Sequence, residues 1–124
     1  MTAAIEVVER YLDALNAQDW RGLARCLTDG EFERIGPFVD VYTDKTAYVE
    51  FLESIVPTLA DYRVEVRRWV PSRDGDVVLV EITESFVMDG TPFAFPEALV
   101  FDVGADGLIS RVQVYMMRPP DNSG

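Results

Sequence analysis

Histidine is absent from the 124-residue sequence, and cysteine occurs once, as Cys26. The missing imidazole excludes Ser-His-Asp and Cys-His nucleophilic machinery and removes the commonest metal ligand. A single cysteine cannot form an internal disulfide, and its position in an apolar helical pattern predicts a small buried core residue. No phosphate-binding glycine loop or metal-ligand spacing occurs either. Any chemistry has to come from carboxylates, tyrosines and arginines, and we expect no metal and no cofactor.

Long apolar runs and basic residues are also scarce. No apolar run approaches membrane-spanning length, and Met1-Thr2-Ala3-Ala4 leads into a helical pattern without a basic or apolar leader region, so no signal peptide is expected. Eleven basic residues against 22 acidic ones give a net charge of -11, which repels phosphate backbones and anionic membranes. We therefore expect a cytoplasmic protein that binds neither nucleic acid nor membrane.

The length and the hydrophobic content of 48% fit one globular domain with a single core. We place this domain at residues 1–118. The remaining residues, 119–124, contain two prolines followed by small and polar side chains and are predicted to be a disordered tail.

Three helices are predicted in the first half of the chain. Apolar residues recur at helical spacing over residues 3–16, and Asp19 can cap a short second helix. A third helix, capped by Asp44 or Thr43, carries another apolar stripe and bends or ends near Pro57.

Strands dominate the second half of the chain. Beyond Asp61 the period of the apolar residues changes from 3.6 to 2, giving one strand before the turn at 71–75, a long hairpin over 77–103 and a last strand over 108–117. A short strand, 32–35, is predicted earlier. This order indicates an α+β fold, with the helices packed on one face of a curved, mostly antiparallel sheet.

The hairpin turns at Asp89-Gly90, which is the strongest short-range hairpin signal. With a two-residue turn, Glu84 faces Phe95 and Ile82 faces Glu97. Side chains alternate between the two faces of a strand, so both glutamates share an otherwise apolar face, as diagonal neighbours roughly 7–8 Å apart.

Two carboxylates on an apolar face need an explanation, because burying a carboxylate is costly unless it is paired or protonated. Glu84 and Glu97 can line a pocket in which raised pKa values suit proton transfer. Alternatively, a longer turn shifts the register by one residue and turns both side chains to solvent. A third possibility is that Glu97 is a buried structural acid, paired with Arg34, Arg68 or Arg111.

The order of the elements carries a resemblance. The chain resembles the nuclear transport factor 2-like superfamily in the order of its elements and in five local features. These features are Arg10-Tyr11-Leu12, the helix break at 16–19, the Gly36-Pro37 corner, and the closing Val-Phe-Asp-Val and Ala-Asp-Gly-Leu-Ile segments. That superfamily includes ketosteroid isomerase, the polyketide cyclases and limonene epoxide hydrolase. The resemblance covers Ala3 to Met117. It implies a cone-shaped fold of three N-terminal helices on a strongly curved sheet, a deep apolar pocket, and a homodimer formed through the sheet's outer face, where Leu79, Val87, Tyr115 and Met117 are exposed candidates.

The resemblance also implies roles for individual residues. Tyr11 falls where ketosteroid isomerase keeps its oxyanion-hole tyrosine, and Glu97 falls where it keeps the assisting carboxylic acid. The general base of that family would be Ile35 or Gly36, so it is missing here, and Asp40, a few residues farther along the chain, is the acid considered as its replacement. The Arg, Asp and Asp of limonene epoxide hydrolase fall on Ile82, Glu84 and Val114, so one acid of that triad remains.

These observations predict a pocket for an apolar small molecule. Tyr11 and Glu97 would donate hydrogen bonds to a developing enolate oxygen while Glu84 takes or returns the proton at carbon, as a cofactor-independent isomerase or cyclase acting on an enone- or polyketide-like substrate. The alternatives are a non-catalytic ligand-binding or dimerisation module, with Tyr11 as a core residue, and a divergent epoxide hydrolase. The remaining predicted pocket residues are Phe51, Ile55, Ile82, Phe86, Phe95, Val112, Val114 and Met116.

Overall fold

The computed structural model describes residues 3–118, so the predicted disordered tail at 119–124 lies outside the described residues. The elements are α1 (Ala3–Ala17), α2 (Trp20–Ala24), β1 (Glu33–Ile35), β2 (Val41–Tyr42), α3 (Lys45–Ile55), the 3-10 helix η1 (Val56–Thr58), β3 (Ala60–Pro71), β4 (Val77–Met88), β5 (Thr91–Val103) and β6 (Ile109–Met116). The α+β class is confirmed. The three α-helices are not one uninterrupted N-terminal block, because β1 and β2 lie between α2 and α3.

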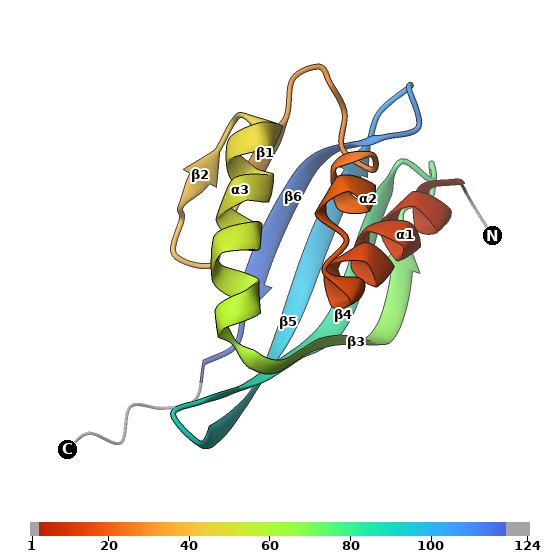
Figure 1. Cartoon of the computed structure of the whole chain (residues 1–124). Coiled ribbons are helices and arrows are strands. Elements are labelled where there is room, and N and C mark those ends of the chain that lie inside the picture. Colours follow the sequence, from red (N-terminus) through yellow and green to blue (C-terminus); the bar gives the residue numbers. More distant parts are fainter. Residues whose placement is uncertain (1–2, 119–124) are drawn as a thin grey trace.

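The strands form a six-stranded sheet in the order β2-β1-β6-β5-β4-β3. All neighbouring strands are antiparallel except β1 and β6, which run parallel. The expectation of a mostly antiparallel sheet is thus confirmed. Figure 1 shows α1, α2 and α3 on one side of this sheet, so one face is covered by helices and the other is free of them.

The β4–β5 hairpin has the register that the Asp89-Gly90 turn predicts. Glu84 pairs with Phe95, and Ile82 pairs with Glu97. Asp89 and Gly90 have φ angles of 51° and 77°, as a two-residue turn with both central residues in the left-handed region requires. The alternative register, in which both glutamates point to solvent, is therefore wrong.

Helix α1 is fixed to the sheet by its apolar face and by its last turn. Val7 and Val8 are buried against the core, and the Tyr11 ring meets Phe101 edge-on at 5.3 Å between centroids. The Asn16 side-chain amide forms two hydrogen bonds with the backbone of β3. It donates to the Val64 carbonyl at 2.8 Å and accepts from the Val64 N–H at 2.7 Å. The position of Tyr11 over the sheet follows from these contacts.

The capping predictions hold for two helices. Asp19 accepts a hydrogen bond from Gly22 N at 2.9 Å, and Asp44, not Thr43, caps α3 by accepting from Thr46 N at 3.0 Å. Cys26 is buried as predicted. Within residues 3–118, every helix is too short or too polar to span a bilayer.

Candidate functional site

Two connected hollows lie between the helices and the covered face of the sheet. The inner cavity, of about 90 Å³, reaches in to Tyr11, Tyr48 and Glu97. The outer cleft, of about 1050 Å³, extends from it past Phe51 and Phe95. Both are lined by Arg34, Pro37, Leu52, Tyr62, Glu84 and Met116. A molecule whose end enters the inner cavity can therefore continue into the outer cleft.

All the residues predicted to form the site line one of these hollows. The inner cavity contains Tyr11, Ile82, Glu84, Glu97, Val112, Val114 and Met116. The outer cleft contains Phe51, Ile55, Phe86 and Phe95, with Glu84 and Met116 shared. Asp40, the acid considered as a replacement base, also lines the outer cleft.

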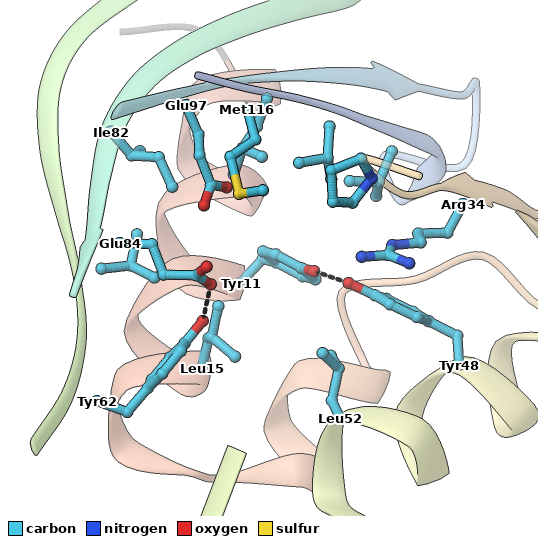
Figure 2. A pocket seen from close by; sticks show the side chains of 15 residues that line it. Tyr11, Leu15, Arg34, Tyr48, Leu52, Tyr62, Ile82, Glu84, Glu97 and Met116 are labelled. Carbon is cyan, nitrogen blue, oxygen red and sulfur yellow. Dashed lines mark hydrogen bonds between the residues drawn. The ribbon is translucent and has the colours of Figure 1, made fainter. Parts of the chain in front are cut away.

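Glu97 is the more buried of the two carboxyl groups, with 8% of the residue exposed. Burial, followed by the adjacent Glu84 carboxylate, raises the pKa of Glu97 to about 9, because both effects disfavour its charged form. Its Oε2 atom has no hydrogen-bond partner among the described residues. At neutral pH this group is a carboxylic acid that can donate its hydrogen bond to Glu84 or to a group bound in the cavity (Figure 2).

Glu84 is held by a tyrosine on the neighbouring strand. The Tyr62 hydroxyl donates to Glu84 Oε2 at 2.5 Å (Figure 2). Burial, and then the charge of Glu84, raises the pKa of Tyr62 well above its usual value, so the phenol keeps the proton that it donates. Tyr62 was not among the predicted site residues, although the alternation of residues 62–66 already puts it on the same face as Val64.

The Tyr11 hydroxyl group forms a hydrogen bond with the hydroxyl group of Tyr48, a residue that was not predicted to belong to the site. The Tyr11 and Tyr48 hydroxyl oxygens are 2.5 Å apart, joining α1 to α3. Burial is the main reason why the pKa of each phenol is raised. Tyr48 is part of the apolar stripe of α3, a pattern that indicates core packing and gives no sign of the hydroxyl contact.

Arg34 enters the cavity from β1, opposite Glu97 (Figure 2). Its Nη1 atom forms an ion pair with Asp40 Oδ2 at 2.7 Å. Its guanidinium carbon lies 5.3 Å from the centre of the Tyr48 ring and 5.7 Å from that of Phe51, distances at which cation–π attraction operates. The alternative in which Glu97 pairs with one of three arginines is wrong, since Arg34, Arg68 and Arg111 form ion pairs with Asp40, Glu81 and Glu33 respectively.

Gly36 leaves room for the Arg34–Asp40 ion pair. A Cβ atom at this position would lie 2.4 Å from Arg34 Nη1 and 2.4 Å from Asp40 Oδ1. A side chain at position 36 would therefore displace the ion pair, and with it the guanidinium group in the cavity wall.

The wall of the outer cleft is aromatic. The rings of Phe86, Phe93 and Phe95 lie 5.6–6.0 Å apart between centroids. They line the cleft without filling it, and 66% of Phe38 and 46% of Met88 are exposed at its rim. The cleft offers an apolar, aromatic surface next to the polar groups of the inner cavity. Within the described residues, no three potential metal-ligating side chains are grouped together.

Comparison with known proteins gives a family profile and several similar structures. Residues 8–112 match the SnoaL-like domain, and no curated protein sequence matches the chain. An LEH-like epoxide hydrolase from Mycobacterium tuberculosis is 23% identical, with a TM-score of 0.79 over 93% of this chain and 83% of its own. Rv0760c from the same organism, solved with estradiol-17β-hemisuccinate, is 18% identical, with a TM-score of 0.79 over 95% of this chain and 100% of its own.

SalBIII, described as an epoxide hydrolase/cyclase-like enzyme in pyran ring formation in the polyether salinomycin, is 19% identical. Its TM-score is 0.79 over 92% of this chain and 90% of its own. At these identities the likeness shows a shared fold, and function has to be argued from the site.

Proposed function

The chain belongs to the SnoaL-like domain family, within the nuclear transport factor 2-like superfamily, and from this premise we propose that it binds a small apolar carbonyl compound and catalyses proton transfer at the carbon next to the carbonyl group. The reaction class is isomerisation or cyclisation without a cofactor. We also propose that the helices and the curved sheet enclose the ligand site as a cone, as the resemblance to the superfamily implies. The complex of the similar Rv0760c with a steroid ester supports a polycyclic ligand of comparable breadth.

The observation that carries the proposal is the pair of dissimilar carboxyl groups in one cavity. Glu84 accepts a hydrogen bond from Tyr62, whereas the pKa of Glu97 is raised to about 9 by burial and by Glu84. Proton transfer at carbon needs a base for the C–H proton and a donor for the carbonyl oxygen that becomes negative. Glu97, which keeps its proton at neutral pH, supplies the donor, and the neighbouring Glu84 is the candidate base in the same cavity.

In the proposed mechanism Glu84 takes a proton from the α-carbon while Glu97 donates a hydrogen bond to the carbonyl oxygen. Tyr11 acts as a second donor when Tyr48 is the donor in the hydrogen bond between the two hydroxyl groups, because that arrangement frees the Tyr11 hydroxyl hydrogen. Protonated Glu84 then returns the proton at a different carbon, which isomerises the substrate. Alternatively, the enolate carbon attacks a second carbonyl carbon of the same molecule, which closes a ring, and protonated Glu84 gives its proton to the alkoxide that forms on that carbonyl oxygen.

Deuterium exchange tests this function. Purified protein is incubated in D2O with a panel of enones and β-keto compounds, and loss of the α-proton signal is followed by NMR. We expect Glu84→Gln and Glu97→Gln each to lower the exchange rate by roughly 10²–10⁴-fold, the usual contribution of an acid–base group.

Glu81→Gln is the matched control, because Glu81 lies on β4 with an ion pair to Arg68 and lines neither the inner cavity nor the outer cleft. We expect it to exchange at the wild-type rate. Retention of the wild-type rate in both the Glu84 and the Glu97 variants would rule out the catalytic proposal.

Epoxide opening is a second candidate, favoured by the same pair of carboxyl groups. Glu84 could activate a water molecule while the neutral Glu97 protonates the epoxide oxygen. The neighbouring Ile82 and Val114 are apolar, so the three-residue polar arrangement that the resemblance implies is incomplete. Formation of a diol from styrene oxide in ¹⁸O-labelled water, lost in Glu84→Gln, would favour this reaction over proton transfer.

A further inference from the structure

Two residues that line the inner cavity, Arg34 and Glu97, each have a buried polar atom without a hydrogen-bond partner. Arg34 Nε and Glu97 Oε2 are the buried side-chain nitrogen and oxygen atoms of residues 3–118 that lack a hydrogen-bond partner. The Arg34 side chain is 9% exposed and the Glu97 residue 8% exposed. Buried polar groups in native proteins are nearly always hydrogen-bonded, and leaving them unpaired is costly. Because both residues line one cavity, we infer that a polar group of a ligand bound there supplies the missing partner.

The protein groups restrict the chemistry of that ligand group. Arg34 Nε–H can only donate, so the ligand must offer an acceptor. The positive charge of Arg34 is already balanced by Asp40 at 2.7 Å, and Glu84 lines the same cavity. An anionic ligand group would therefore gain little from the guanidinium and would be repelled by the carboxylate. A neutral carbonyl oxygen, with its two lone pairs, fits both donors without adding charge.

The size of the two hollows restricts the rest of the ligand. About 90 Å³ in the inner cavity accommodates a polar end group, whereas the outer cleft of about 1050 Å³ has room for a much larger body. The Phe86, Phe93 and Phe95 rings form an aromatic wall there. Such a surface suits the face of an aromatic or polycyclic system.

We propose that Arg34 Nε and Glu97 together hold the carbonyl oxygen of a neutral aromatic or polycyclic ketone whose apolar body lies along the outer cleft. This inference rests on the proposed use of the cavity as the ligand site, and it adds Arg34 as a residue that contacts the substrate. Arg34 then determines specificity, since its N–H distinguishes a carbonyl group from a hydrocarbon of the same shape. During proton transfer the same contact stabilises the charge that develops on the oxygen.

Three naphthalene probes test the proposal by titration calorimetry. 2-Acetylnaphthalene carries the carbonyl group, 2-isopropenylnaphthalene replaces the oxygen with a CH2 group, and 2-naphthoate carries an anion. We expect the wild-type protein to bind the ketone about 10–100-fold more tightly than the alkene, as a hydrogen bond from a charged donor predicts. We expect 2-naphthoate to bind more weakly than the ketone.

Arg34→Lys keeps the positive charge but removes the planar Nε–H donor. We expect it to lower the ketone-to-alkene ratio to near one while the affinity for the alkene stays the same, which a misfolded cavity would not do. Arg68→Lys is the matched control, because Arg68 pairs with Glu81 away from both hollows, and it should keep the wild-type ratio.

Infrared spectroscopy gives a second measurement, which reports the hydrogen bond directly. The C=O stretch of bound, carbonyl-¹³C-labelled ketone should lie at lower frequency in the wild-type protein than in Arg34→Lys. The proposal is overturned if ketone and alkene bind equally well to the wild type, if 2-naphthoate binds as tightly as the ketone, or if Arg34→Lys leaves both the ratio and the stretch unchanged.

The outcomes separate this inference from the proposed function. A preference for the ketone without deuterium exchange supports the Arg34 contact and removes the catalytic proposal. Exchange that depends on Glu84, together with an unchanged ratio in Arg34→Lys, supports catalysis and removes the Arg34 contact.

Discussion

The protonation of Glu97 links the candidate site to the stability of the whole chain. The pKa of Glu97 is raised to about 9 in the folded protein, first by burial and then by Glu84, whereas an unfolded glutamate titrates near about 4.3. Between these values the unfolded chain has released the proton and the folded chain still holds it. The contribution of Glu97 to the free energy of unfolding should therefore be highest below about pH 4.5. This contribution should fall as the pH rises toward 9.

Glu97→Gln should remove this decline, because glutamine has nearly the same shape and no proton to lose. At pH 8 we expect the variant to be more stable than the wild type by at least about 1 kcal/mol, with a smaller difference at pH 5. Urea denaturation at both pH values measures it. Glu65→Gln, at an exposed residue paired with Arg67, should follow the wild type, and an equally steep decline in the Glu97 variant would contradict the assignment.

Tyr62 positions the proposed base, so its hydroxyl group should matter for catalysis. Tyr62→Phe keeps the ring but removes the hydrogen bond to Glu84. We expect the deuterium-exchange rate at saturating substrate to fall roughly 10-fold, by about the free energy of one hydrogen bond, with little change in KM. Tyr115→Phe, at a residue that is 54% exposed, serves as the control. An unchanged rate in Tyr62→Phe would show that Glu84 does not need this contact.

Among the elements, the β4–β5 hairpin depends on its turn. Gly90 has a φ of 77°, which an alanine adopts only with strain, although no atom lies within 4 Å of the position of its Cβ. Gly90→Ala should therefore lower the free energy of unfolding by about 1 kcal/mol through backbone strain alone.

The matched control for this turn is Gly30→Ala. A Cβ at Gly30 would meet only the Thr28 hydroxyl oxygen, at 3.5 Å, and Gly30 does not have a positive φ of this kind. We expect that variant to unfold close to the wild type in the same denaturation experiment. Equal stability of the two variants would contradict the role assigned to the turn.

The same hairpin explains how much of the site the sequence predicts. Its pairing depends on local features, the Asp89-Gly90 turn and the alternation of apolar residues, and these put Glu84 and Glu97 on one face. The polar contacts of the site are not local. Tyr11 meets Tyr48 across 37 positions of the chain, and Tyr62 meets Glu84 across 22.

Arg34 shows most clearly which part of the site cannot be predicted from local sequence features. It lies on β1, a strand of only three residues, and is buried because β1 pairs with both β2 and β6. Alternation with Phe32 is the one local sign that its side chain turns inward. One element boundary also differs from the prediction. β3 includes Pro71, which the sequence analysis assigns to the turn at 71–75.

At the scale of the whole molecule, the face of the sheet without helices is open to a partner. A hollow of about 380 Å³ lies there beside Ala98, Tyr115 and Met117, and Tyr115 and Met117 are 54% and 65% exposed. We propose that two copies of the chain associate through this face, because exposed apolar side chains gathered in this way favour burial.

Tyr115→Glu should convert the proposed dimer into a monomer, since it would bury a charge in each half of a symmetric interface. Light scattering on a size-exclusion column measures the mass of both proteins. A wild-type protein that elutes as a monomer at tens of micromolar would contradict this proposal, and leave the account of the cavity unaffected.

The central claim is that a neutral carboxylic acid stands beside a second glutamate in the inner cavity. Direct titration of the glutamate side chains, labelled with ¹³C at the carboxyl carbon, tests it by NMR. We predict that one signal, absent from Glu97→Gln, stays in its protonated position through neutral pH and moves only near the pKa of about 9. If the signal that Glu97→Gln removes instead titrates with the ordinary glutamates near about 4.3, the claim is contradicted.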